Sequence, residues 1–224
     1  MLFNSLQFFV FFIAVYSVYL ILPHRRQNQL LIVASCIFYA AWNWKFLILM
    51  FLSISTDYFC SNKIYSSDDP HVKKRFLCLS IFVNLSILGF FKYFNFFTNS
   101  LSALLSWFFP TIDFRFALNI ILPVGISFYT FEAISYTVDV YRGIMRPARN
   151  YWDYVLFVIY FPHLIAGPIM RAKDFLPQIT APRIIKSEQF YEGCFLTFWG
   201  LFEKVFVADN LAKIVDPVFN SPPP

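Results

Sequence analysis

The sequence predicts an all-α protein that crosses a membrane several times and carries a re-entrant segment. Of its 224 residues, 58% are hydrophobic and only 14% are charged, whereas a soluble domain has about a quarter of its residues charged. Apolar runs of about twenty residues match the length of a membrane-spanning helix. Lys and Arg gather in short clusters between these runs, so the net charge of +5 is typical of membrane topology and not of nucleic-acid binding.

The first apolar run, residues 3–22, predicts a span. The basic turn at 24–26 follows it, and the positive-inside rule places that turn in the cytoplasm and the N-terminus outside. No cation precedes the run and no small-residue cleavage site follows it, so it is expected to remain as an anchor. Residues 30–60 would make one helix of about 47 Å, too long for one span. The break Trp-Asn-Trp-Lys at 42–45 therefore divides them into two helices.

The middle of the chain predicts two further spans. One covers residues 76–97, and a short apolar piece at 101–109, ended by Pro110, is expected to lie at the membrane interface. The next covers residues 122–141 and leads to a cluster of three arginines that indicates the cytoplasmic side.

Residues 151–169 are apolar but contain Pro162, Gly167 and Pro168. A full crossing would place the cations that follow on the outer side, against the charge rule. A broken segment that turns back to the cytoplasm resolves this conflict. Irregular backbone at membrane depth has to be buried in protein or line a watery cavity, so a cavity is predicted near 162–168.

A last helix is expected to begin with Ser187 as its N-cap. It carries three charged residues on a largely apolar stretch, Glu203, Lys204 and Asp209. Because unpaired charges on an apolar helix are costly in lipid, they are expected to pair within the protein.

Two acids lie inside a largely apolar and aromatic stretch, residues 122–143. Glu132 and Asp139 are seven residues apart, close to two helical turns, so they share a face with Ser135 and Tyr136. An ionisable side chain at membrane depth indicates a functional interior by default. The alternative for Asp139 is that it lies near the helix end and pairs only with Arg142.

No local catalytic or metal-binding motif occurs in the sequence. The four cysteines have no paired spacing for zinc or for disulfides and are expected to be small buried hydrophobes. His24 and His71 stand in polar segments and are expected to be solvated. His163 follows Pro162 in the broken segment, where a structural histidine is favoured over a catalytic one.

Five stretches of the sequence occur together in a known family. They are LPVGISFYTFEAISYTVDVYRG, YFPHLIAGPIMRAKDFLPQI, GLFEKVFVADNLAKIVDPVF, NLSILGFFKYFNFF (which begins at Asn84) and ASCIFYAAWN. In their order along the chain, and over essentially its whole length, they resemble the N-terminal half of the membrane-bound O-acyltransferases. The subgroup they resemble most is the alginate O-acetylase type.

The resemblance implies a helical ring around a funnel, of which residues 1–224 are the N-terminal portion of one membrane-embedded domain. It implies a bacterial inner-membrane location and no bound cofactor, with acetyl-CoA or another acyl thioester as donor. An acetyl group would pass to alginate or a similar exopolysaccharide, with a periplasmic acetyltransferase as partner. The family's catalytic histidine lies in the half absent here, so the chain is expected to be a fragment, inactive alone and without a catalytic residue.

The resemblance and the residues together suggest roles. The candidates for lining the tunnel or orienting the donor are Glu132, Tyr136, Asp139 and His163. His163 stands where relatives often have Gln, which argues against a catalytic role.

The candidates for attracting donor phosphates are Arg142, Arg171 and Lys204, with ordinary positive-inside topology as the alternative. Two other functions stay open. One is a transporter or channel subunit, which buried acids and a broken helix also suit. The other is a non-catalytic membrane scaffold for polysaccharide assembly.

Overall fold

The computed structural model describes residues 3–108, 121–164, 167–184 and 186–220, and within these ranges the chain is helical, with no strand. It divides into two compact units. One unit comprises Met1–Ile21 with Pro182–Pro224, and the other comprises Leu22–Ala181. The all-α class predicted from the sequence is confirmed for the described residues.

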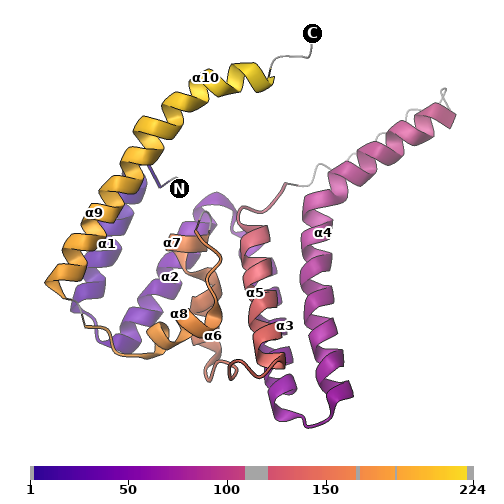
Figure 1. The fold of residues 1–224 in the computed structure, drawn as a ribbon, viewed down its shortest axis with the longest axis horizontal. Helices are drawn as coiled ribbons and strands as arrows, with labels where there is room; N and C mark the ends of the chain where they lie inside the picture. Colours follow the sequence, from indigo (N-terminus) through magenta and orange to yellow (C-terminus); the bar gives the residue numbers. More distant parts are fainter. Residues whose placement is uncertain (1–2, 109–120, 165–166, 185, 221–224) are drawn as a thin grey trace. The chain divides into compact units, whose positions relative to one another are not determined.

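The N-terminal helices follow the predicted division (Figure 1). Helix α1 covers Leu6–Ile21, α2 covers His24–Asn43 and α3 covers Lys45–Ser66, so the break predicted at 42–45 falls at Trp44. Pro23 lies at the N-cap of α2 with a φ of −68°, and proline is well tolerated at a helix start. The basic residues 24–26 consequently form the first turn of α2, where a loop was expected.

Helix α4 covers Pro70–Phe108, 39 residues without a break. Residues 101–108 therefore continue the helix predicted at 76–97, where a separate piece was expected, and Pro110 lies outside the described residues. Whether residues 101–108 lie at a membrane interface stays a prediction. Residues 98–101 contain no proline or glycine, so nothing in them interrupts the backbone hydrogen bonds of the helix. Among the described helices, α4 alone has the length and apolarity to cross a membrane, while α1 is apolar but shorter. The number of spans stays a prediction.

Helix α5 covers Ile126–Tyr141 and begins four residues later than expected. Pro123 precedes it, and Gly125 at its N-cap has a φ of +76°, a left-handed conformation that glycine adopts without steric cost. The Tyr39 hydroxyl of α2 donates to the Val124 carbonyl at 3.0 Å. The start of α5 is therefore tied to α2.

The segment predicted to be broken consists of α6, Tyr151–Ile159, and the single turn α7, Phe161–Leu164. The backbone leaves the helical conformation at Tyr160, where φ is −54° and ψ is 108°, so the break is confirmed. Residues 154–159 are all buried, which satisfies the requirement that such backbone be covered by protein. Whether the segment re-enters a membrane stays a prediction. The cavity predicted near 162–168 also stays a prediction, because Ile165 and Ala166 lie outside the described residues.

The remaining helices are α8, Ala172–Thr180, then α9, Ser187–Phe202, the π-helical turn η1, Glu203–Ala208, and α10, Asp209–Asn220. The N-cap of α9 is Lys186, so Ser187 is the first helical residue and the predicted Ser187 cap is wrong. No described residue of α1, α9 or η1 is buried.

The core lies in the unit Leu22–Ala181, where α3, α4 and α5 pack on one another and α2 packs on α3, α6 and α7. Figure 1 shows α3, α4 and α5 running alongside each other. Four tyrosines are among its largest fully buried side chains: Tyr39, Tyr129, Tyr136 and Tyr154. The core is therefore rich in hydroxyl groups as well as in apolar surface.

Candidate functional site

The acids predicted to share a face of α5 are buried together. Glu132 is 3% exposed, Asp139 is 2% exposed and Tyr136 between them is fully buried. Ser135 is half-buried, and its hydroxyl donates to the Glu132 carbonyl at 2.8 Å. The face of α5 that carries the two acids therefore points into protein, where an unneutralised carboxylate is costly.

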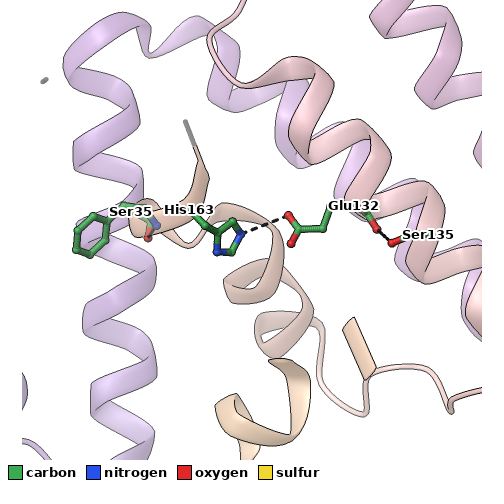
Figure 2. Close-up of polar contacts among 5 residues, drawn as sticks. Ser35, Glu132, Ser135 and His163 are labelled. Atoms are coloured by element: carbon green, nitrogen blue, oxygen red, sulfur yellow. Dashed lines mark hydrogen bonds and ion pairs between the residues drawn. The ribbon is translucent and has the colours of Figure 1, made fainter. Parts of the chain in front are cut away.

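Glu132 meets His163 of the broken segment. The Oε2 atom of Glu132 lies 3.3 Å from Nε2 of His163, and both side chains are largely buried, at 4% and 11% exposure. The contact lacks the geometry of a good hydrogen bond, and Glu132 Oε1 has no partner among the described residues. Figure 2 shows the carboxylate of α5 and the imidazole facing each other across the interior. Sequence reasoning placed both residues in the interior but did not pair them.

The broken backbone holds His163 in place. The Gly167 N–H donates to the His163 carbonyl at 3.1 Å, and a Cβ at Gly167 would lie 2.5 Å from the His163 Cβ. Glycine is therefore required where the chain crosses over the histidine. The rings of Tyr160 and Phe175 lie 5.5 and 5.6 Å from the imidazole.

The broken segment is also anchored to α2. The Phe161 N–H, at the first residue of α7, donates to Ser35 Oγ at 3.1 Å, and Ser35 in turn donates to the Leu31 carbonyl at 2.7 Å. Ser35 therefore supplies an acceptor for a backbone N–H at the break, where regular helix pairing is lost. Figure 2 shows Ser35 beside the turn that carries His163.

Asp139 pairs across the fold with Arg171, whose Nη2 donates to Asp139 Oδ1 at 3.3 Å. Arg171 stands at the N-cap of α8, so the pair ties that helix to α5. Arg142 is exposed and makes no ion pair within the described ranges. The alternative in which Asp139 pairs only with Arg142 is therefore wrong.

Tyr136 is held by three neighbours. Its hydroxyl accepts from Ser61 Oγ at 3.1 Å and from the Ala148 N–H at 3.0 Å, and its ring stacks on Tyr154 at 4.3 Å. These contacts fix the loop after α5 against the core. The tunnel-lining role suggested for Tyr136 stays a prediction.

Lys204 forms an ion pair with Asp209 in the unit that contains α9, η1 and α10. This confirms the expected pairing of these two charges along the chain. The positive charge of Lys204 is thereby partly balanced, and so is that of Arg171.

The structure contains a buried polar cluster that sequence reasoning missed. Asp57 of α3 is fully buried, and its Oδ1 accepts from Ser80 Oγ at 2.5 Å and from Asn84 Nδ2 at 2.7 Å, both on α4. Ser53 donates to Asn84 Oδ1 at 2.7 Å, and Thr137 of α5 lies 3.2 Å from Ser80 Oγ. The cluster joins the three helices of the core. Two signals were available: an acid inside an apolar run, and Ser80 and Asn84 at helical spacing.

The fold and the site together define the class of protein. It is a helical protein with the composition of a membrane protein, and it has a buried contact between an acid and a histidine where a helix is broken. No family model matches the sequence, and no solved structure matches it.

The chain does match curated proteins. It is 40% identical to the probable alginate O-acetylases AlgI of Azotobacter vinelandii and of Pseudomonas putida, over 98% of this chain and 44% and 45% of those proteins. It is 34% identical to the peptidoglycan O-acetyltransferase of Helicobacter pylori, over 96% of this chain and 46% of that protein. The chain is therefore similar to these O-acetyltransferases over nearly its whole length, and the match falls on their N-terminal part. It spans less than half the length of these relatives.

Proposed function

We propose that these residues form the N-terminal part of a membrane O-acetyltransferase that esterifies carbohydrate hydroxyl groups. One observation carries this proposal: proteins named for two different acceptors, alginate and peptidoglycan, match nearly the whole chain. What the two names share is acetyl transfer to a sugar hydroxyl. A region common to both is expected to serve the transfer itself and not the choice of acceptor.

The chemistry is acyl transfer. The acceptor oxygen forms a bond to the acetyl carbonyl carbon while the bond from that carbon to the donor sulfur breaks. The hydroxyl proton goes to a general base and the sulfur leaves as a thiolate that is then protonated. We propose that the base is a histidine outside residues 1–224, and that the donor is acetyl-CoA or another acyl thioester.

The buried residues of this chain would then hold the wall of the proposed funnel in position around the reacting groups. Glu132 and His163 join α5 to the broken segment, and Asp139 joins α5 to α8, so together they fix the wall of the proposed funnel. Tyr136 supports the same wall from inside the core. A preorganised wall favours transfer because little rearrangement is needed at the moment of reaction.

Binding the phosphates of the donor requires cations that are not already paired with an acid in the protein. Arg142 meets that requirement within the described residues, whereas Arg171 and Lys204 are engaged by Asp139 and Asp209. We propose an inner-membrane location with the N-terminus outside, several spans, and a periplasmic acetyltransferase as partner. Helix α4 and the apolar α1 support the membrane location.

The test is acetylation of alginate in a bacterium that lacks its own alginate O-acetylase. The chain alone is expected to give no acetyl ester, because the proposed base is not among residues 1–224. A chimera in which this chain replaces the matching N-terminal part of the P. putida relative is expected to restore acetylation. The intact relative is the positive control, and equal membrane levels are checked by immunoblot. Esters made by the chain alone, or a stable chimera without activity, would contradict the proposal.

A further inference from the structure

A hollow lies between the loop that follows α5 and helix α8. It has a volume of about 460 Å³, within the range of about 300–1,000 Å³ found for small-molecule sites. Three cations line it, Arg146 and Arg149 from the loop and Lys173 from the first turn of α8. All three side chains are exposed, and none forms an ion pair within the described residues.

The lining combines positive charge with apolar surface. Asp153 is the one acidic residue among the lining residues, so the hollow has an excess of two positive charges. Met145, Leu176 and Pro177 contribute apolar walls. Arginine offers a planar fork of donors that suits phosphate oxygens, and lysine offers a mobile point charge.

Both walls are held by the core. The Ile144 N–H donates to the Asp139 carbonyl at 2.9 Å across Gly143, whose φ is +71°, and the Ala148 N–H donates to the buried Tyr136 hydroxyl at 3.0 Å. The start of α8 is tied to Asp139 through Arg171. Contacts with α5 therefore fix the backbone that carries the cations on both sides of the hollow. Because this backbone is already ordered, binding a ligand costs less conformational entropy.

We propose that this hollow binds a phosphate-bearing ligand that also has an apolar part. Two sources share that chemistry: a soluble acyl carrier such as coenzyme A, and the headgroup of an anionic lipid. The proposal rests on the proposed function insofar as the ligand is the acyl donor. It assigns the phosphate contacts to Arg146, Arg149 and Lys173, because these three line the hollow and Arg142 does not. Arg171 and Lys204 are already paired.

The test compares two variants of the full 224-residue chain, purified in detergent or in nanodiscs. The hollow variant carries Arg146→Gln, Arg149→Gln and Lys173→Gln. The matched control carries Lys73→Gln, Lys74→Gln and Arg75→Gln, which removes the same charge from the first turns of α4. Binding of coenzyme A is measured by calorimetry. Thermal unfolding is measured in nanodiscs of phosphatidylglycerol and of phosphatidylcholine.

If the ligand is a soluble acyl carrier, the hollow variant is expected to bind coenzyme A at least about tenfold more weakly than the unaltered chain. The control variant is then expected to lose little affinity. If the ligand is a lipid, only the hollow variant loses the extra thermal stability given by phosphatidylglycerol. Equal losses in both triple variants, or no response of the unaltered chain to either probe, would overturn the proposal.

A second measurement uses the unaltered chain, so that it does not depend on the folding of a variant. Amine acetylation by a small reagent is followed by mass spectrometry, with and without coenzyme A or phosphatidylglycerol. Protection of Lys173 but not of Lys74 is expected from one of these ligands, and equal reactivity in all cases would overturn the proposal. Because binding is measured here and ester formation in the chimera, failure of this site and failure of the proposed function are distinguishable.

Discussion

Two carboxylates buried in the same unit have opposite surroundings. Asp57 accepts two short hydrogen bonds from α4 through one oxygen, and its partners are bonded in turn to Ser53 and Thr137. Among the described residues, the carboxylate of Glu132 meets only His163, at 3.3 Å and with poor geometry. Each acid leaves its second oxygen without a partner in the described part of the chain.

The difference separates a structural acid from a candidate functional one. A buried carboxylate with charge-assisted hydrogen bonds on regular helices holds those helices together. A buried carboxylate with one weak contact, beside broken backbone, is costly for the fold alone. Such a residue indicates a site where a ligand or a proton completes the arrangement.

The largest effect is expected for Asp57→Ala. It leaves the Ser80 hydroxyl and the Asn84 amide without their acceptor and opens a small cavity, so the free energy of unfolding should fall by about 2–4 kcal/mol. Unfolding is followed by circular dichroism in mixed detergent micelles with increasing SDS. Asp68→Ala, at an exposed loop position, is the control and should leave stability unchanged. If the free energy of unfolding falls no more than in the control, the polar cluster does not stabilise the packing of α3 on α4.

An intermediate effect is expected for Gly167→Ala. The new Cβ would lie 2.5 Å from the His163 Cβ, so the backbone or the histidine has to move, at a cost of about 1–3 kcal/mol. Gly89→Ala on α4 is the matched control, because a Cβ there meets nothing within 4 Å. Unfolding reports the cost, and NMR of labelled histidine reports the displacement of the imidazole. An unshifted His163 signal would mean that Gly167 does not position the Glu132 contact.

The smallest effect is expected for Glu132→Gln. The amide keeps the shape and removes a poorly compensated charge, so stability should change by less than about 1 kcal/mol, in either direction. Asp57→Asn is the matched comparison and should cost more, because it weakens two charge-assisted hydrogen bonds. Both are measured in the same unfolding assay. Equal costs would remove the distinction between the two acids.

Several elements were predictable because their signals are local. The Trp-Asn-Trp-Lys break marks the boundary of α2 and α3. Pro123 and Gly125 are local signals for the start of α5 at Ile126, which the expected range 122–141 did not use. Pro162 and Gly167 indicate the broken segment. The helix end expected before residue 101 is absent, because residues 98–101 contain no proline or glycine that would end α4 there. A helix continues where nothing breaks its backbone hydrogen bonds.

The candidate site was predictable only in part. Helical spacing placed Glu132, Tyr136 and Asp139 on one interior face, and their burial agrees with this. The partners His163 and Arg171 come from segments about thirty residues further on, and no local rule selects them. Asn84 begins one of the stretches that carried the family resemblance, yet its bond to Asp57 is visible only once α3 and α4 are packed.

The sequence by itself determined the helical class, the apolar character and the resemblance to O-acetyltransferases, because composition, periodicity and motifs are properties of neighbouring residues. Tertiary structure alone decided that Asp57 is hydrogen-bonded to α4 and that Glu132 has one weak contact. It also decided which cations around the hollow remain unpaired within the described residues. The physical reason is that the energy of a buried charge depends on the groups within a few ångströms of it. Those groups are brought there by helix packing and not by order along the chain.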